Sequence, residues 1–283
     1  MRLVTTTNTI QIPAEESVKV CAEAGYKFLD APICGWLRKD GPLTRDDWES
    51  WTHNLRKIAD SSGVSFIQSH GFFIKYLDIN GIPAHPEYDE YIRRSIIASE
   101  ILGVNWMVLH PTFWPDSDGH ADYKKSFKYN RDFFSKWGEF ASRHNVGIAV
   151  ENMPNIPGEF LYYCVRVEEL LELVDSLNDP MIKICIDTGH AHLSKQSIPD
   201  YISAVGSRLV VTHIDDNHQN KDEHIAPFQG TTPWKDVMQA FKKLEQDFYF
   251  TFEIHHMTSC FPAEIQAPLA KFSFVLGNYL LSL

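Results

Sequence analysis

Residues 182–192 read IKICIDTGHAH and hold the pattern that decides the fold. The short apolar run Ile182–Asp187 ends in a charged residue, and a turn with Gly189 and His190 follows at once. Runs of this kind, bounded by turn residues, are typical of strands. Seven similar runs lie at Leu3–Thr7, Tyr26–Ala31, Val64–Ser69, Asn105–His110, Gly147–Asn152, Leu209–Ile214 and Phe248–Ile254. The sequence therefore predicts eight strands.

Amphipathic stretches that predict helices separate these runs. The stretch Thr44–Ser61, for example, places Trp48 and Leu55 on one face and ends before Gly63. The others are Pro13–Ala24, Pro86–Leu102, Lys124–His144, Val167–Leu177, Pro199–Val205, Pro233–Leu244 and Pro262–Leu281. Strict alternation of strand and helix predicts a parallel sheet, and no GxGxxG motif of an open doubly wound sheet follows the first strand. We expect one domain over residues 1–283, an α/β fold of the single (β/α)₈ TIM-barrel type.

Charge and cysteine usage narrow the class of protein. The formal net charge is −11, which disfavours a surface built mainly to hold nucleic-acid phosphates. The five cysteines form no CxxC motif, which indicates reduced thiols. The first ten residues lack the apolar core of a signal peptide, and no apolar run approaches the roughly 18 residues that span a bilayer. We expect a cytoplasmic protein that binds a small molecule and no membrane.

Six of the eight expected strands have an acid or a histidine at their last residue or directly beside it. These residues are His70, His110, Glu151, Asp187, His213 and Glu253. Because side chains alternate between the two faces of a strand, the apolar Val150, Ile186 and Phe252 would face the helices. The acids and histidines should then point into the barrel mouth at its C-terminal face, where such barrels carry their chemistry.

A divalent metal would account for so many ionisable side chains meeting there. Carboxylates and imidazoles buried together need a counter-charge. Nitrogen and oxygen ligands without thiolate suit Zn²⁺, Mn²⁺, Co²⁺ or Fe²⁺. The loop after the seventh run adds Asp222 and His224, which could be aimed at one ion. The alternatives without a metal are separate buried ion pairs for the acids, substrate contact for His70 and His110, and a solvated loop for Asp222 and His224.

Several motifs along the chain resemble those of a known superfamily. They are ENMP at 151–154, DTGHAH at 187–192, HIDDN at 213–217, DEH at 222–224 followed by PFQGTTPW, and FEIHH at 252–256. In this order they resemble the xylose isomerase-like TIM-barrel superfamily. It includes the sugar phosphate isomerase/epimerase family, inosose dehydratase-type enzymes and the endonuclease IV type of abasic-site nuclease.

The resemblance implies a metal site and a reaction. The core metal ligands would be Glu151, Asp187, His213 and Glu253, with Zn²⁺ or Mn²⁺ as the ion. Glu151 and Glu253 would also be catalytic, moving a proton next to the carbonyl of a sugar or cyclitol derivative through a metal-stabilised enediolate. The enzyme would be an isomerase or epimerase, and homo-oligomers are common among the resembling epimerases.

Further residues are candidates for holding the substrate. The resemblance implies that His190 contacts it, and His70 and His110 lie at the same strand ends. Trp114 follows the fourth run, and its ring face would suit a sugar, although a packed loop anchor is the alternative. The ketose epimerases carry a second substrate glutamate six residues after the first, where this chain has Pro157 and only Glu159 nearby.

The nuclease type of the superfamily implies an alternative function. A trinuclear-zinc phosphodiesterase acting on abasic DNA would use five additional metal ligands, namely His70, His110, His190, Asp222 and His224. All of these residue types are present. However, the residues after His213 read IDDNH, where the nucleases have an N-D-S-K type run. This difference favours the sugar enzyme.

Overall fold

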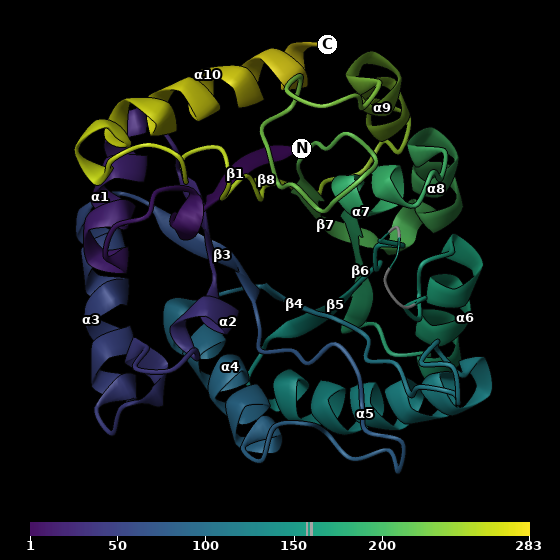
Figure 1. Ribbon diagram of the computed structural model, residues 1–283. Coiled ribbons are helices and arrows are strands. Elements are labelled where there is room, and N and C mark those ends of the chain that lie inside the picture. The colour runs from purple at the N-terminus through teal and green to yellow at the C-terminus, as the bar shows by residue number, and fades with distance from the viewer. Residues whose placement is uncertain (157, 159–160) are drawn as a thin grey trace.

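The computed structural model describes residues 1–156, 158 and 161–283. Its strands are all parallel and close into a barrel in sequence order, with β1 paired to β8 (Figure 1). The strands are β1 (Arg2–Thr6), β2 (Phe28–Ala31), β3 (Ser65–His70), β4 (Trp106–Leu109), β5 (Gly147–Glu151), β6 (Ile182–Asp187), β7 (Leu209–Ile214) and β8 (Tyr249–Phe252). The predicted TIM-barrel fold is confirmed.

The helices surround the barrel, as Figure 1 shows. They are α1 (Ala14–Ala24), α2 (Ile33–Trp36), α3 (Trp48–Ser61), α4 (Tyr88–Leu102), α5 (Tyr123–Arg143), α6 (Val167–Leu177), α7 (Thr188–Leu193), α8 (Ile198–Val205), α9 (Trp234–Lys242) and α10 (Ala267–Ser282). Two helices begin later than the sequence predicts, because short 3₁₀ turns, Pro42–Thr44 and Ala263–Ile265, precede α3 and α10. The short helix α2 was not predicted.

The alternation of side chains along the strands creates two apolar regions. Val108, Ala149, Cys185 and Val211 pack together inside the barrel. Their neighbours in the chain, such as Val150, belong to the larger core between strands and helices. Burial of this kind stabilises a fold by about 25 cal/mol per Å² of apolar surface. Residues that follow these inner residues by two positions in the chain therefore also face inward. They lie at the end of the barrel where β5, β6 and β7 finish.

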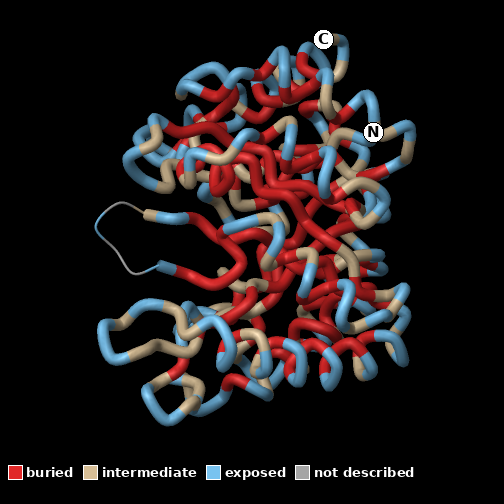
Figure 2. The backbone as a smooth tube through the Cα atoms, turned by 90° about the vertical axis from the view of Figure 1, so that its right-hand side faces the viewer, coloured by how far each residue is buried: buried red, intermediate tan, exposed pale blue. Residues whose placement is uncertain are grey.

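Register places these strand ends side by side. Asp187 pairs with His213 across β6 and β7, and Glu151 pairs with Cys185 across β5 and β6. The barrel strands form the buried centre of the molecule, and exposed segments lie at its periphery (Figure 2). All five cysteines carry free thiols. Within the part of the chain that the structure describes, no helix combines the length and apolar character needed to cross a bilayer.

Candidate functional site

Three carboxylates from strand ends lie around one imidazole nitrogen, which belongs to a fourth strand-end residue, His213. Nδ1 of His213 lies 2.9 Å from Oε1 of Glu151, 3.2 Å from Oε2 of Glu253 and 4.0 Å from Oδ2 of Asp187. Glu151, Asp187 and His213 are buried and the side chain of Glu253 is 15% exposed. We call these four residues the four-residue centre. They are the residues for which the sequence predicts a common metal ion, and the structure brings them together.

The donor atoms of the four-residue centre suit a divalent cation. Three carboxylates and one imidazole provide oxygen and nitrogen ligands, the set that Zn²⁺ and Mn²⁺ accept. The Oδ2 atom of Asp187 is buried and has no hydrogen-bond partner among the described residues. A buried carboxylate oxygen without a partner is costly, and a cation at this point would satisfy it.

The pKa values within the centre shift in opposite directions. Burial by itself raises the pKa of a carboxyl group, but the neighbouring His213 holds the pKa of Glu151 well below its usual range. The same histidine lowers the pKa of Glu253 to about 2 against the effect of burial. For Asp187, burial and the nearby carboxylate of Asp215 raise the pKa well above its usual range. Asp187 is thus the candidate ligand whose negative charge is stabilised least by the surrounding protein.

A second cluster, the two-histidine group, consists of His70, His110 and Glu151. The Oε2 atom of Glu151 lies 3.0 Å from Nε2 of His110 and 3.5 Å from Nε2 of His70. The two Nε2 atoms are 3.0 Å apart. These three atoms are close enough to hold one cation. Glu151 therefore belongs to both clusters, one through each carboxylate oxygen.

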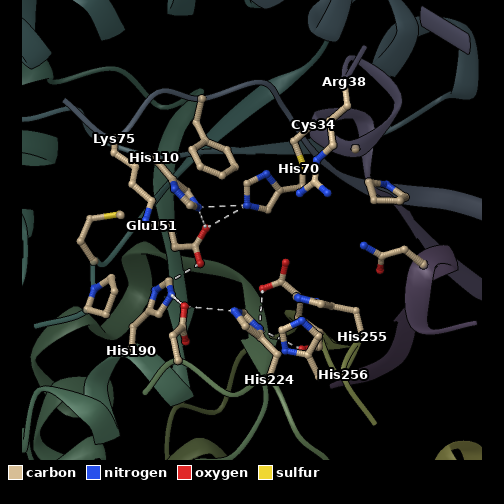
Figure 3. A pocket seen from close by; sticks show the side chains of 18 of the residues that line it. Cys34, Arg38, His70, Lys75, His110, Glu151, His190, His224, His255 and His256 are labelled. Carbon is tan, nitrogen blue, oxygen red and sulfur yellow. Dashed lines mark hydrogen bonds and ion pairs between the residues drawn. The ribbon is translucent and has the colours of Figure 1, made fainter. Parts of the chain in front are cut away.

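A third cluster, the loop group, consists of His190, Asp222 and His224. The Oδ2 atom of Asp222 lies 3.4 Å from Nε2 of His190 and 3.3 Å from Nε2 of His224. Nδ1 of His190 lies 2.7 Å from the backbone oxygen of Asn152, to which it donates a hydrogen bond in the tautomer that leaves Nε2 free. The loop group also could hold a cation. Figure 3 shows side chains of all three clusters around one pocket.

Backbone contacts at the end of β6 aim His190 into this pocket. The side-chain amide of Asn152 exchanges two hydrogen bonds with the backbone of Asp187, at 2.7 and 3.0 Å. The Oδ1 atom of Asp187 accepts a hydrogen bond from the backbone N–H of His190 at 2.5 Å and so caps α7. This arrangement links the four-residue centre to the loop group through the main chain.

The loop that carries Asp222 and His224 is organised by Asp216. The buried carboxylate of Asp216 accepts hydrogen bonds from four backbone N–H groups and one indole, those of Asn217, Phe228, Gly230, Thr232 and Trp234. Asp216 also pairs with Ile225 through the backbone, which closes the base of the loop. The sequence motif HIDDN contains Asp216, but its spacing alone gives no sign of this structural role.

Asp215 is a site residue that was not predicted from the sequence. It is fully buried, and its Oδ2 atom lies 2.8 Å from Nδ1 of His224. Burial raises the pKa of Asp215 to about 6, although His224 opposes the shift. Asp215 stands two positions after His213, so the same alternation that places His213 inward could have identified it.

Gly189 is required where α7 passes this carboxylate. A Cβ atom on residue 189 would lie 1.8 Å from Oδ1 of Asp215. We expect Gly189→Ala to destabilise the protein by about 1–3 kcal/mol, the usual cost of overpacking. At roughly 2–4 °C per kcal/mol, thermal unfolding followed by circular dichroism should show a decrease of several degrees in Tm.

Gly35→Ala is the matched control, because an added Cβ at residue 35 meets no atom within 4 Å. Its Tm should equal that of the parent protein. Equal Tm values for the two alanine variants would contradict the packing argument at Gly189.

The pocket itself has a volume of about 650 Å³. The predicted residues that line it are His70, His110, Glu151, His190, Asp222, His224 and Glu253. His255 and His256 also line it, and burial lowers the pKa of His255 to about 3. Asp187 and His213 are fully buried and are not part of its wall.

Several lining residues lie outside the strands and were not predicted from the sequence. They are Asn8, Gln11, Cys34, Arg38, Phe73, Lys75, Met153 and Tyr162. Arg38 and Lys75 follow β2 and β3, and any residue of such a loop can reach the mouth of a barrel. That general rule was the available signal, and it does not distinguish one loop residue from another.

The structure places Trp114 outside this pocket. It lines a separate groove along α5 together with Lys125, and its Nε1–H donates to the backbone oxygen of Ile79 at 3.2 Å. Its backbone N–H is bound by Ser126 Oγ of α5 at 2.9 Å, which holds the residue against that helix. This position of Trp114 agrees with the alternative to substrate contact, in which the residue is a packed anchor of its loop. Glu159 lies outside the residues that the structure describes.

The relatives found by sequence comparison include an epimerase and a probable endonuclease. A family model described as xylose isomerase-like TIM barrel matches residues 18–272. A D-psicose 3-epimerase of Enterocloster bolteae is 25% identical over 138 residues, which are 47% of this chain and 42% of that protein. A probable endonuclease 4 of Mesomycoplasma hyopneumoniae is 22% identical over 135 residues, 47% of this chain and 46% of that protein. The chain spans about half the length of the curated relatives it matches.

The similarity of this chain to solved structures extends over the whole barrel. A D-psicose 3-epimerase crystallised in the presence of D-fructose matches with a TM-score of 0.76 at 13% identity, covering 99% of both chains. The IolI protein with a bound zinc atom matches with a TM-score of 0.76 at 18% identity, covering 100% of this chain and 98% of that chain. At these identities the likeness shows the shared fold.

Proposed function

Because the chain belongs to the xylose isomerase-like TIM-barrel family, we propose that it is a divalent-metal-dependent isomerase or epimerase of a sugar or cyclitol derivative. One observation carries the proposal: Glu151 and Glu253 both lie beside Nδ1 of His213 and both line the pocket. The D-psicose 3-epimerase among the relatives supports this class of reaction.

The four-residue centre would hold the metal. When bound there, the cation would polarise neighbouring carbonyl and hydroxyl oxygens of a substrate and stabilise the negative charge that follows loss of a proton. Zn²⁺ and Mn²⁺ are the ions that we propose from the donor set.

Glu151 and Glu253 would transfer the proton. Both carboxylates have lowered pKa values and are therefore ionised at neutral pH, as a base must be. One carboxylate would accept the proton from the carbon next to the carbonyl. The other would first take up a proton from water and then return it to the substrate, and loss of the first proton to water would restore both carboxylates. Removal from one face and return on the other inverts that carbon, which is epimerisation. Return to the adjacent carbon gives isomerisation.

The rest of the pocket would position the substrate. Nε2 of His190 is turned toward Asp222 and into the pocket, where it can hold a substrate oxygen. Phe73, Met153 and Tyr162 provide apolar wall that limits the water around the reacting carbon. The volume of about 650 Å³ lies within the range of roughly 300–1,000 Å³ typical of small-molecule sites.

The test is proton exchange in deuterated water with a panel of ketoses. We expect the metal-loaded protein to exchange the proton next to the carbonyl and to form the epimer or isomer, both followed by NMR. Treatment with a chelator should abolish both signals, and added Zn²⁺ or Mn²⁺ should restore them. Failure of the loaded protein to exchange any ketose or cyclitol ketone of the panel would contradict the proposal.

An abasic-site DNA duplex in the same panel tests the nuclease alternative. The variant His224→Ala removes a candidate ligand of the loop group and none of the four-residue centre, although His224 also lies 3.7 Å from Oε2 of Glu253. We expect it to keep the metal of the four-residue centre and to change mainly substrate affinity. Loss of one metal ion per chain together with loss of abasic-strand cleavage would replace the proposed function with phosphodiester hydrolysis.

A further inference from the structure

Three side chains that line the pocket form a further group, which includes a residue of none of the clusters above, His255. The group consists of His224, Glu253 and His255, and one ligand atom of each lies within 4.8 Å of the other two. The ring centroids of the two histidines are 4.3 Å apart. Figure 3 shows both histidines on the side of the pocket away from His70 and His110. We call these three residues the His255 group.

Backbone contacts hold the loops that carry the two histidines against each other. The N–H of His256 donates a hydrogen bond to the backbone oxygen of His224 at 3.3 Å. Nδ1 of His256 lies 2.9 Å from the backbone oxygen of Glu223 and donates to it in the tautomer with hydrogen on that nitrogen. The relative placement of His224 and His255 is therefore fixed by the main chain, as a metal site requires.

The ring of His224 is oriented by the groups around one of its nitrogens. Nδ1 lies 3.1 Å from the backbone oxygen of Glu253 and 2.8 Å from Oδ2 of Asp215. Because both neighbours are oxygen acceptors, Nδ1 carries the ring hydrogen, and Nε2 keeps a free lone pair. A carbonyl or carboxylate beside the second nitrogen of an imidazole is the usual support of a metal-binding histidine. His224 has both.

The ring of His255 has a buried nitrogen that no protein group satisfies. Its Nδ1 atom has no hydrogen-bond partner among the described residues, although solvent does not reach it. A buried polar atom without a partner costs free energy, and native proteins contain few of them. A cation in the His255 group would bind the lone pair of this nitrogen and remove that cost.

The number of acids on this side of the pocket favours a second cation. The four-residue centre contributes three carboxylates, and Asp215 and Asp222 add two more, at 2.8 and 3.3 Å from the ring of His224. One divalent ion offsets two of these five negative charges. A second divalent ion offsets two more, in a place where water cannot screen them well.

We propose that His224, His255 and Glu253 form a second metal site, which takes one Zn²⁺ ion in addition to the ion of the four-residue centre. Two imidazoles and one carboxylate are a ligand set of zinc sites that keep a fourth coordination position open. All three residues line the pocket, so the open position is accessible from it. Glu253 would belong to both sites, because its carboxylate has two oxygens.

The loop group competes with this second site for His224. Nε2 of His224 also lies 3.3 Å from Oδ2 of Asp222, so an ion on His224 is completed either by Asp222 and His190 or by His255 and Glu253. In the loop group each histidine already has Asp222 as a partner. Nδ1 of His255 has none among the described residues, so an ion gains more at the His255 group.

A second ion has a consequence for catalysis, which rests on the proposed function. Glu253 transfers a proton only while one of its oxygens is free, and an ion in the His255 group occupies that oxygen. We expect the first equivalent of Zn²⁺ to activate the enzyme and excess Zn²⁺ to inhibit it. Unchanged turnover with both ions bound would remove the role of Glu253 as a base and leave the second site standing.

Calorimetric titration of the metal-free protein with Zn²⁺ tests the site without any substrate. We expect the native protein to bind two ions per chain, the second more weakly because it has three protein ligands and not four. His255→Ala should keep the tight ion and reduce the affinity for the second by more than the roughly 10–100-fold that loss of a supporting residue costs. His53→Ala, an exposed position on α3, is the matched control and should bind two ions.

Asp222→Asn separates the second site from the loop group, because it removes a ligand of the loop group alone. We expect this variant to keep both ions. Loss of the second ion in Asp222→Asn but not in His255→Ala would overturn the inference, and so would binding of a single ion by the native protein. Thermal unfolding of each variant checks that the fold is retained.

His255→Cys tests directly whether residue 255 touches the metal. A thiolate is also a ligand for Zn²⁺ and Co²⁺, so the variant keeps a donor at this position. Loaded with two equivalents of Co²⁺, it should show a thiolate-to-metal charge-transfer absorption in the near ultraviolet that the native protein loaded in the same way does not show. A folded His255→Cys protein that binds two Co²⁺ ions without this absorption would overturn the inference.

Discussion

Asp187→Ala is expected to remove the metal from the four-residue centre while the barrel stays folded. Asp187 is buried, its Oδ2 atom lacks a hydrogen-bond partner among the described residues, and burial together with Asp215 raises its pKa. It is therefore the carboxylate that most needs a cation. Even residues that only support metal ligands change affinity by about 10–100-fold, so loss of a ligand should reduce it by more. Metal content by elemental analysis and folding by circular dichroism are the measurements.

The variant Asp187→Asn separates the two roles of this residue. Asparagine can still cap α7 by accepting the hydrogen bond from the N–H of His190, because it caps helices as well as aspartate does. We expect both variants to lose the metal and only Asp187→Ala to lose the roughly 1 kcal/mol of the cap. Full metal occupancy in Asp187→Ala would show that Asp187 is not a ligand.

Glu151→Gln and Glu253→Gln are expected to stop the interconversion of epimers. A positioned acid or base accelerates proton transfer by about 10²–10⁴-fold, so each variant should lose at least this factor in kcat, measured at saturating metal. The two variants should differ in one respect. Each keeps one base and should still exchange the proton of the epimer that this base faces, while conversion to the other epimer is lost.

Glu223→Gln is the control for this pair. Glu223 accepts hydrogen bonds from the backbone and ring of His218 and does not line the pocket, so the same chemical change there should leave kcat unaltered. Exchange and interconversion at native rates in Glu151→Gln or Glu253→Gln would contradict the assigned roles.

The barrel and the floor of the site could be predicted because both follow from periodicity. Alternation along a strand fixes which face a residue takes, and parallel strands bring their ends to one side. For this reason Glu151, Asp187 and His213 could be placed together from the sequence. Asp215 follows the same rule and could have been included.

The rim of the pocket could not be predicted in the same way. Loop side chains follow local turn geometry and contacts between loops, which have no sequence period. Trp114 was expected beside the substrate, but Ser126 and Ile79 hold it in a separate groove. Arg38 depends on the turn at Gly41, and Lys75 depends on pairing with Phe113. These contacts become visible only when the loops are seen together.

Anomalous diffraction from crystals of the metal-loaded protein, recorded at the absorption edge of the metal that copurifies with it, tests the central claim most directly. We expect a strong peak within bonding distance of all four side chains of the four-residue centre, Glu151, Asp187, His213 and Glu253. A peak held only by the two-histidine group or only by the loop group, with none at the four-residue centre, would contradict the account.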